Sequence, residues 1–405
     1  MIQQSTNFCK GQIKKFEENF SEIENLYWKQ VLTNFFEREY ISYPTQRGNQ
    51  ENMPNIYKQI SMSDRITTDR GTICMYFYCE KCKKQYPLNS RSYMCECGGM
   101  FHLHKDSKDE PVHEITIGEH ETPLLPFSVG NLDFLLKMES MQPTGSFKDR
   151  GAYTLINEIQ HLGIDKIMLD SAGNAGASIA AYAAAAKIDC TVYVPDDASP
   201  EKIEQIEAYG AKTVKVPNGR MKACSAVKQN LGDAYYASHV YNPLFFEGMK
   251  SIAHETYRQL GNTVPDYVFV PVGNGTLLLG LYYGFEEIGR MPHFVAVQSK
   301  KCDPLYEAFH GLPEKPKRTT IADAIRIEKP KRLHDMVRAI KNSDGDVVAV
   351  EDTEIVRAKK YLSSRGIYVE MTSAAVLAGA LAYFQAGKPD NYRVVLPITG
   401  HGLKR

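Results

Sequence analysis

Short runs rich in valine and isoleucine recur from about residue 118 to the end of the chain. They read KIMLDSA, CTVYVP, KTVKVP, DYVFVPV, HFVAVQ, DVVAVE and RVVLPI. Most are followed by a turn signal and then by a segment of helical length. Continuous apolar strands that alternate with helices are typical of a parallel sheet with helices on both faces. The hydrophobic pattern therefore predicts an α/β fold.

The first 70 residues follow a different pattern. Within residues 13–40, apolar side chains recur every three or four positions, namely Phe16, Phe20, Ile23, Tyr27, Val31 and Phe35. This spacing predicts an amphipathic helix. The stretch RGNQENMPN that follows is typical of a loop. Such a helix packs on the main body or forms an arm that binds a partner or regulates the protein, and the sequence leaves both open.

Composition narrows the classes of function. Lysine plus arginine and aspartate plus glutamate both number 48, so the formal net charge is zero. A neutral chain gives no electrostatic case for nucleic acid or an anionic membrane as partner. The N-terminus has no apolar signal-peptide core, and the longest run of small apolar residues, AGASIAAYAAAAKI, is too short for a membrane span. We expect a cytoplasmic protein that acts on a small molecule.

The cysteines indicate a local metal site. There are nine, an odd number that argues against a fully disulfide-bonded chain. Four of them form two closely spaced pairs: Cys79, Cys82, Cys95 and Cys97. Two such pairs joined by a hairpin supply the four tetrahedral thiolates that a structural Zn²⁺ ion prefers. The cluster therefore predicts a zinc-ribbon-like module with these four cysteines as ligands.

The second cysteine pair is one residue shorter than the usual C-x-x-C spacing. Three other side chains can replace a thiolate, namely Cys74, His102 and His104. A ribbon that keeps its shape without metal, or a redox-active cluster, are the alternatives. With four protein ligands a bound zinc ion has no open position, so we expect no catalysis at this metal.

Three glycine-rich stretches follow strand-like runs. They are Ser171–Gly176 (SAGNAG), Pro271–Thr276 (PVGNGT) and Thr399–Gly402 (TGHG). Backbone N–H groups at a helix N-terminus or in a glycine nest bind anions. Neither the Walker A pattern nor G-x-G-x-x-G is present. Each loop alone is weak evidence for ligand binding, and only the three together indicate a binding site.

Lys148 lies in GSFKDRG, among small residues and directly before an apolar helical pattern. It is a solvated surface lysine or a nucleophile. A lysine that forms a Schiff base needs a carbonyl, and pyridoxal phosphate supplies both a carbonyl and a phosphate. The loop at 273–276 would then bind the phosphate and Asn174 the 3′-oxygen. Thr399 would place a neutral hydroxyl against the pyridine nitrogen, which favours elimination and replacement over transamination.

Taken together, PTGSFKDRG, S-x-G-N-x-G, PVGNGT and TGHGLK resemble the threonine synthase group. That group belongs to the fold type II (tryptophan synthase β-like) pyridoxal phosphate enzymes. The resemblance covers residues 74–405, and a zinc-ribbon-like segment also precedes the catalytic body in this group. It implies two open, twisted, mostly parallel sheets flanked by helices, an amino-acid substrate and a homodimer.

We therefore divide the chain into three parts. Residues 1–70 are an N-terminal helical extension, 71–110 the zinc-ribbon-like module and 111–405 the catalytic body. The body is expected to hold two α/β subdomains, the smaller at roughly 160–250. At 405 residues a chain of two or three domains is the ordinary expectation.

The resemblance also implies roles for single residues. Lys148 is the Schiff-base lysine and moves protons at the substrate Cα, and Phe147 packs near the cofactor ring. The phosphate ligands are Gly273, Asn274, Gly275 and Thr276. The remaining cofactor contacts are Asn174 and Thr399. The substrate carboxylate is held by Ser171, Ala172, Gly173 and Ala175.

The implied reaction is elimination and replacement on an amino acid, with O-phosphohomoserine and water giving threonine and phosphate. Two departures keep alternatives open. PDDASPEKIEQIEAYGA is closer to the dehydratase and cysteine synthase style, and PVGNGT lacks the longer G-N-x-G-N form. Dehydration of serine or threonine, or β-replacement on an activated serine, is the alternative reaction. A non-catalytic relative that acts through protein contacts is a remote one.

Four further residues have less specific signals. We interpret Glu370, at the head of an alanine-rich helix, as a capping or interface residue rather than a catalytic acid. His401 is interpreted as structural. His239 and Arg220 are minor candidates for contacts to a substrate phosphate.

Overall fold

The computed structural model describes residues 65–68, 71–106, 113–198, 200–217, 219–385 and 392–404. The chain divides into two compact units, Met1–Gln59 and Ile60–Arg405, and every described residue belongs to the second. The amphipathic helix expected within residues 13–40 lies outside the described residues. In the described part of the chain, no helix combines the length and apolarity that a membrane crossing needs.

The larger sheet has six strands. In order across the sheet they are β13 (Asp346–Val350), β12 (His293–Ser299), β11 (Tyr267–Pro271), β14 (Val394–Pro397), β6 (Leu132–Lys137) and β5 (Leu124–Val129). All neighbours pair in parallel except β5, which pairs antiparallel with β6. β14 is flanked by β11 and β6, and all four of its residues are buried. The central strands are apolar throughout because helices cover both faces.

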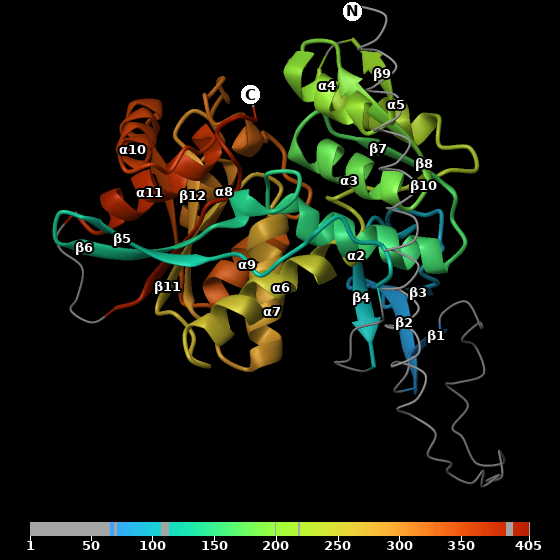
Figure 1. The fold of residues 1–405 in the computed structure, drawn as a ribbon, viewed down its shortest axis with the longest axis horizontal. Coiled ribbons are helices and arrows are strands. Elements are labelled where there is room, and N and C mark those ends of the chain that lie inside the picture. Colours follow the sequence, from blue (N-terminus) through green and yellow to red (C-terminus); the bar gives the residue numbers. More distant parts are fainter. Residues whose placement is uncertain are drawn as a thin grey trace, which may run out of the picture. The chain divides into compact units, whose positions relative to one another are not determined.

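Alternating side chains of the larger sheet enter two different cores. On β11, Val268 and Val270 belong to the core shared with α6 (Pro243–Gln259) and α7 (Thr276–Ile288), whereas Phe269 belongs to the core shared with α11. This follows from the two-residue period of a strand. α11 (Met371–Tyr383) and α10 (Asp352–Ser364) lie together beside the sheet in Figure 1.

The smaller sheet has four parallel strands. In order they are β10 (Tyr235–Tyr236), β7 (Lys166–Asp170), β8 (Asp189–Pro195) and β9 (Lys212–Val216). The helices α3 (Asn174–Ala185), α4 (Pro200–Ala208) and α5 (Arg220–Gln229) pack on its strands, as Figure 1 shows, and α2 (Lys148–His161) packs on α3. All seven valine- and isoleucine-rich runs form parallel strands, so the prediction of an α/β fold is confirmed.

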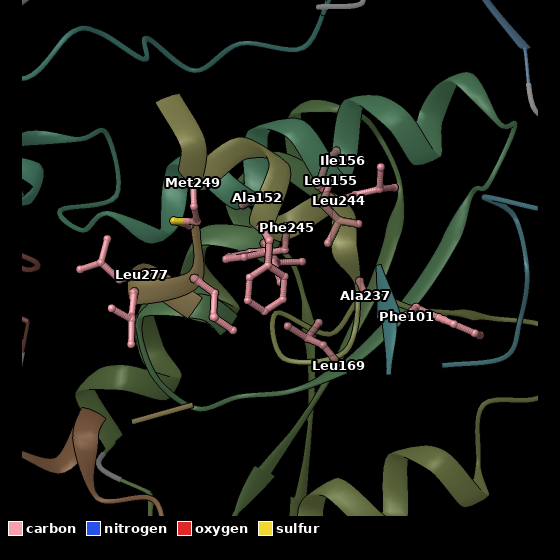
Figure 2. Packing of buried hydrophobic residues seen from close by; sticks show 14 of the residues in the cluster. Phe101, Ala152, Leu155, Ile156, Leu169, Ala237, Leu244, Phe245, Met249 and Leu277 are labelled. Carbon is pink, nitrogen blue, oxygen red and sulfur yellow. The ribbon is translucent and has the colours of Figure 1, made fainter. Parts of the chain in front are cut away.

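The remaining elements complete the frame around these sheets. They are α8 (Pro304–His310), α9 (Leu333–Asn342) and two short 3₁₀ helices, η3 (Glu139–Met141) and η4 (Asp323–Ile325). Where α2 crosses α6, Gly151 leaves room for Phe245, whose ring would lie 2.4 Å from a Cβ at that position. Figure 2 shows Phe245 among Ala152, Leu155 and Met249 in this part of the core.

The cysteine-bearing segment forms a separate antiparallel sheet. Its strands are β1 (Arg65–Thr68), β2 (Gly71–Cys79), β3 (Gln85–Tyr86) and β4 (Phe101–Lys105). Phe77, Leu88 and Phe101 are buried in the same core as α2 and α6. The buried Arg332 guanidinium also donates a hydrogen bond of 3.0 Å to the Phe101 carbonyl. The segment is therefore packed directly on the α/β body.

A buried group of charges joins β6, η3, α2 and α6. Arg150 of α2 donates to Glu139 at 2.8 and 2.9 Å and to Glu255 at 2.8 Å. Lys137 donates to Glu255 at 2.7 Å, and the Thr122 hydroxyl donates to Glu139 at 2.6 Å. All five residues are less than 10% exposed. Buried charges are tolerated only when they are paired and hydrogen-bonded, and here each one is.

We expect Glu255→Ala to lower the free energy of unfolding by about 3–5 kcal/mol, because it leaves Lys137 and Arg150 as undercompensated buried cations. Urea denaturation of the purified protein measures this. Glu121→Ala is the matched control, since Glu121 pairs with Arg258 at 3.2 Å where both side chains are roughly half exposed. Loss of that pair should cost less than about 1 kcal/mol. Equal losses in the two variants would contradict the expectation.

Candidate active site

A cavity of about 390 Å³ lies at the carboxyl ends of strands from both parallel sheets. Its walls include the loop after β7, the loop after β11 and the loop after β14, together with the first residues of α2 and α5. Open α/β sheets bind ligands at this edge, and sites for small molecules and cofactors range from roughly 300 to 1,000 Å³. The cavity has the position and size of such a site.

The cavity brings together every residue to which the sequence assigned a contact with the cofactor or the substrate carboxylate. They are Phe147, Lys148, Ser171, Ala172, Gly173, Asn174, Ala175, Gly273, Asn274, Gly275, Thr276 and Thr399. These positions lie in four separate segments of the chain, so their meeting is a property of the fold. It could not follow from any one motif.

Lys148 is the first residue of α2 and lines the cavity. The loop before it is held by the loop after β14, since the Phe147 N–H donates to the Thr399 carbonyl at 3.0 Å. The lysine amine lies 4.5 Å from the centre of the Phe147 ring and 5.6 Å from that of Phe245. No residue in the described ranges forms a hydrogen bond or an ion pair with this amine.

Burial lowers the pKa of Lys148 to about 7, and the negative charge of Glu370 acts in the opposite direction. Desolvation disfavours the ammonium form, so a substantial fraction of the amine is neutral at neutral pH. A neutral amine is the nucleophilic form of lysine. The position therefore suits covalent attachment to a carbonyl group.

Glu370 sits between two of the predicted cofactor contacts. Its carboxylate accepts one hydrogen bond of 3.0 Å from the Asn174 amide and another of 3.0 Å from the Thr399 hydroxyl. The Ser373 hydroxyl lies 2.8 Å from that of Thr399. A Cβ at Gly400 would stand 2.5 Å from the Glu370 carboxyl carbon, so a larger residue there would displace this carboxylate. Burial raises the pKa of Glu370, while the hydrogen bonds from Asn174 and Thr399 lower it.

The interpretation of Glu370 as a capping residue was wrong. Glu370 does occupy the N-cap position of α11, but its side chain makes no capping hydrogen bond and instead lines the cavity. The reason is long-range, since the partners of the carboxylate come from α3 and from the loop after β14. His401 keeps a structural place, because its N–H donates to the Gly145 carbonyl at 2.9 Å.

The loop after β11 is shaped for an anion. Gly275 adopts a left-handed conformation with φ of 85°, and α7 begins at the next residue. A Cβ at Gly275 would lie 2.3 Å from the Met336 sulfur, and one at Gly273 would lie 2.8 Å from the Ala324 carbonyl oxygen. The first N–H groups of a helix have no partner within the helix, so they are available to a phosphate.

A second group of basic side chains lines the same cavity. The guanidinium groups of Arg220, at the start of α5, and of Arg326, beyond η4, form no hydrogen bond or ion pair with any residue in the described part of the chain. Lys202 of α4 is ion-paired with Asp323. His239 lies in the same lining, and burial, followed by the charges of Lys148 and Arg220, holds its pKa well below the usual range. It is therefore a neutral imidazole.

Sequence reasoning ranked Arg220 and His239 as minor candidates and did not identify Lys202, Asp323 or Arg326. Lys202 lies in PDDASPEKIEQIEAYGA, the stretch that departs from the threonine synthase pattern, so the sequence does carry a signal at this position. Arg326 follows a 3₁₀ helix that carries no recognisable motif.

Comparison with known proteins gives the family. A family model described as pyridoxal-phosphate dependent enzyme matches residues 115–400. The chain belongs to this family. Threonine synthase of Methanocaldococcus jannaschii is 34% identical, over 80% of this chain and 92% of that protein. Threonine synthase of Synechocystis is 32% identical, over 78% of this chain and 86% of its own length.

Solved structures of pyridoxal-phosphate dependent enzymes have the same fold. Serine racemase from Dictyostelium discoideum matches with a TM-score of 0.62 and 28% identity, covering 70% of this chain and 92% of that one. Maize serine racemase matches with 22% identity and a TM-score of 0.61, over 70% of this chain and 88% of that one. At this identity the match supports the fold alone. The chain is a threonine synthase-like, fold type II pyridoxal phosphate enzyme, as the motifs indicated.

The residues of the cavity fit the family's cofactor. An aldehyde needs an unprotonated amine, and Lys148 has one of lowered pKa without a partner in the described ranges. A phosphate needs free N–H groups and close approach to the backbone, which the glycines at 273 and 275 permit. Asn174 and Thr399 add two polar side chains in the same lining.

Attachment of pyridoxal phosphate to Lys148 should accelerate with pH between about 6 and 8, because only the neutral amine attacks and its pKa is about 7. Glu370→Gln removes the charge that raises this pKa, so the midpoint should move to lower pH. Stopped-flow absorbance of the apoenzyme mixed with the cofactor measures both profiles. A midpoint that stays in place or rises in the variant would show that Glu370 does not act on Lys148.

Proposed function

We propose that Lys148 binds pyridoxal phosphate covalently and that residues 273–276 bind its phosphate. Asn174 contacts the 3′-oxygen, and its bond to Glu370 fixes the orientation of the amide. Thr399 contacts the pyridine nitrogen, and Phe147 packs near the ring. The loop at 171–175 holds the substrate carboxylate. These roles are supported by the common cavity and by the match of each motif to the family.

The proposed reaction converts O-phosphohomoserine and water into threonine and phosphate. The observation that carries it is the pair of arginines Arg220 and Arg326. Their side chains line the cavity and form no hydrogen bond or ion pair with any described residue. Arginine is suited to phosphate because its planar guanidinium forms two parallel hydrogen bonds. The loop at 273–276 already accounts for the cofactor phosphate, so the two arginines suit a second phosphate, on the substrate.

The bound cofactor supplies an electron sink that stabilises negative charge at the substrate Cα. The residues of the chain do the rest. The Lys148 amine takes the proton from Cα and can return it to the neighbouring carbons, since its lowered pKa suits proton transfer in both directions near pH 7. Arg220 holds the phosphate as it leaves. His239 also lines the cavity and is neutral, so it does not compete with Arg220 as a second cation for that phosphate.

Product analysis separates the candidate reactions. Release of inorganic phosphate and threonine from O-phosphohomoserine supports the proposal, whereas release of a keto acid from serine or threonine supports dehydration. We expect Arg220→Ala to raise KM for O-phosphohomoserine about tenfold or more, because it removes a charge-assisted contact to the phosphate. The cofactor absorbance of this variant should match that of the wild type.

Two controls keep the result interpretable. Lys148→Ala should abolish turnover and covalent attachment of the cofactor together. Arg365→Ala changes an exposed arginine at the C-cap of α10, where its guanidinium contacts Tyr361, and should leave KM unchanged. An unchanged KM in Arg220→Ala would remove the support for a phosphorylated substrate.

We also propose that the cysteine cluster binds one structural zinc ion. The four Sγ atoms of Cys79, Cys82, Cys95 and Cys97 lie within 4.8 Å of one another. Tetrahedral thiolates at the usual Zn–S distance stand about 3.8 Å apart. The two histidines among the other candidate ligands have contacts elsewhere, since His104 stacks on Tyr76 and His102 contacts Glu80.

The short second pair is compatible with this geometry. Gly98 takes a left-handed turn with φ of 79°, and Gly99 lies so close to Cys79 that a Cβ would stand 2.4 Å from its sulfur. The Tyr86 hydroxyl also contacts Cys95 Sγ at 3.2 Å, on the buried side of the cluster.

Elemental analysis of the purified protein should find one zinc per chain. Cys82→Ser should lose the metal and lower the melting temperature, because metal binding contributes to folding. Cys74→Ser is the matched control, with a cysteine on the same sheet but outside the cluster, and should keep the metal. A wild-type protein without zinc, or one whose cluster forms disulfides, would contradict the proposal.

Three further expectations, two from the family resemblance and one from the N-terminal sequence, remain proposals. The body forms two α/β subdomains around the two parallel sheets, the enzyme is a homodimer, and it works in the cytoplasm. Sedimentation velocity tests the second point, and a mass equal to that of a single 45.6 kDa chain would contradict it.

A further inference from the structure

Asp149, the residue after Lys148, is fully buried and accepts three hydrogen bonds. Two come from Thr144, whose N–H and hydroxyl donate at 2.7 and 2.5 Å. The third comes from the hydroxyl of Ser178. Nothing in the proposed chemistry uses this carboxylate. Burying a carboxylate is costly unless it is hydrogen-bonded, so the presence of Asp149 at this position needs a reason.

The partners of Asp149 lie on both sides of the site. Thr144 belongs to the loop that leads into Lys148. Ser178 lies on α3, one turn after Asn174, which is the first residue of that helix. Asp149 therefore connects the helix that begins at Lys148 with the helix that begins at Asn174.

α2 depends on this connection because its own start is weakly held. Its N-cap residue, Phe147, makes no capping hydrogen bond through its side chain. The Asp149 carboxylate reaches back to the N–H of Thr144 instead. The Thr144 carbonyl is held in turn by the Lys404 amine at 2.6 Å. Both main-chain polar groups of Thr144, its N–H and its carbonyl, are therefore hydrogen-bonded, and they hold the loop that leads into Lys148.

The start of α3 is equally constrained. A Cβ at Gly176 would lie 1.9 Å from the Ser171 carbonyl oxygen, so the loop at 171–174 folds tightly over the first turn of the helix. A shift of α3 therefore carries the loop and Asn174 with it. The bond from Ser178 to Asp149 joins this helix to the helix that begins at Lys148.

We propose that Asp149 is a positioning residue. By accepting hydrogen bonds from Thr144 and Ser178, it fixes the Lys148 amine relative to the Asn174 amide, so that both reach one cofactor molecule at the same time. Misplacement of reacting groups by about 1 Å can cost a factor of about 100 in rate. The inference rests on the cofactor roles proposed for Lys148 and Asn174, and does not depend on the identity of the substrate.

The test replaces the donors, because Asp149→Asn changes a fully buried charge and can prevent folding. Ser178→Ala and Thr144→Val each remove one hydroxyl with little change in shape, and Thr144→Ser keeps the hydroxyl. Apoenzyme is titrated with pyridoxal phosphate, reduced with borohydride and digested. Mass spectrometry then gives the fraction of Lys148 that carries the cofactor, and the absorption maximum of the unreduced protein is recorded alongside.

We expect Ser178→Ala and Thr144→Val to weaken attachment about tenfold, since each removes one hydrogen bond to a buried carboxylate, and to shift the absorption maximum. Thr144→Ser should attach the cofactor as the wild type does. Ser343→Ala is the matched control. It removes a buried hydroxyl that bonds to the Ile340 carbonyl at the end of α9, and should leave attachment unchanged even where its melting temperature falls.

The outcomes separate the two proposals. Wild-type attachment in both Ser178→Ala and Thr144→Val, with an unchanged absorption maximum, would overturn the positioning role while leaving the cofactor assignment intact. An equal loss in Ser343→Ala would overturn it too, because the effect would then reflect general stability. A wild-type chain that does not attach pyridoxal phosphate at Lys148 would overturn the cofactor assignment and this inference together.

Discussion

The arrangement around Lys148 depends on the buried guanidinium of Arg150. This group is bonded to Glu139 of η3 and Glu255 of α6, and Glu255 is bonded in turn to Lys137 of β6. Because removing one partner of a buried pair leaves an uncompensated charge, these elements cannot separate cheaply. The first turn of α2 is thereby attached to the larger sheet. Lys148 takes its place from that attachment.

Three successive residues then have three different tasks. Lys148 faces the cavity, Asp149 connects its helix to α3 and the smaller sheet, and Arg150 connects it to α6 and the larger sheet. The helix start is thus held from two sides by polar contacts rather than by apolar packing alone. Hydrogen bonds have directions and apolar contacts do not, so this arrangement defines one position for the amine. Main-chain hydrogen bonds also join the loop after β14 to the loop that leads into Lys148, and they add further directional contacts.

Local patterns were sufficient for much of the fold. The valine- and isoleucine-rich runs mark parallel strands because strands buried on both faces need continuous apolar sequence. The hairpin of β5 and β6 was missed, since LLPFSV and LDFLLK mix polar with apolar positions, and β10 has only two residues. Glu370 shows the limit for the site. Of its two hydrogen-bond partners, Asn174 lies 196 residues away along the chain and Thr399 lies 29 residues away. No local sequence pattern contains either of them.

The place of β14 has a consequence for how the protein is made. β14 (Val394–Pro397) lies between β6 and β11, so the larger sheet is incomplete until nearly all of the described chain has left the ribosome. The smaller sheet draws its strands from a single stretch, Lys166 to Tyr236, and can form earlier. Until β14 arrives, β6 and β11 each present an unpaired apolar edge, which is the kind of surface that aggregates. Distant pairing of this kind also slows folding. The growing chain should therefore need protection during this interval, and heating or truncation that frees β14 should expose the same two edges.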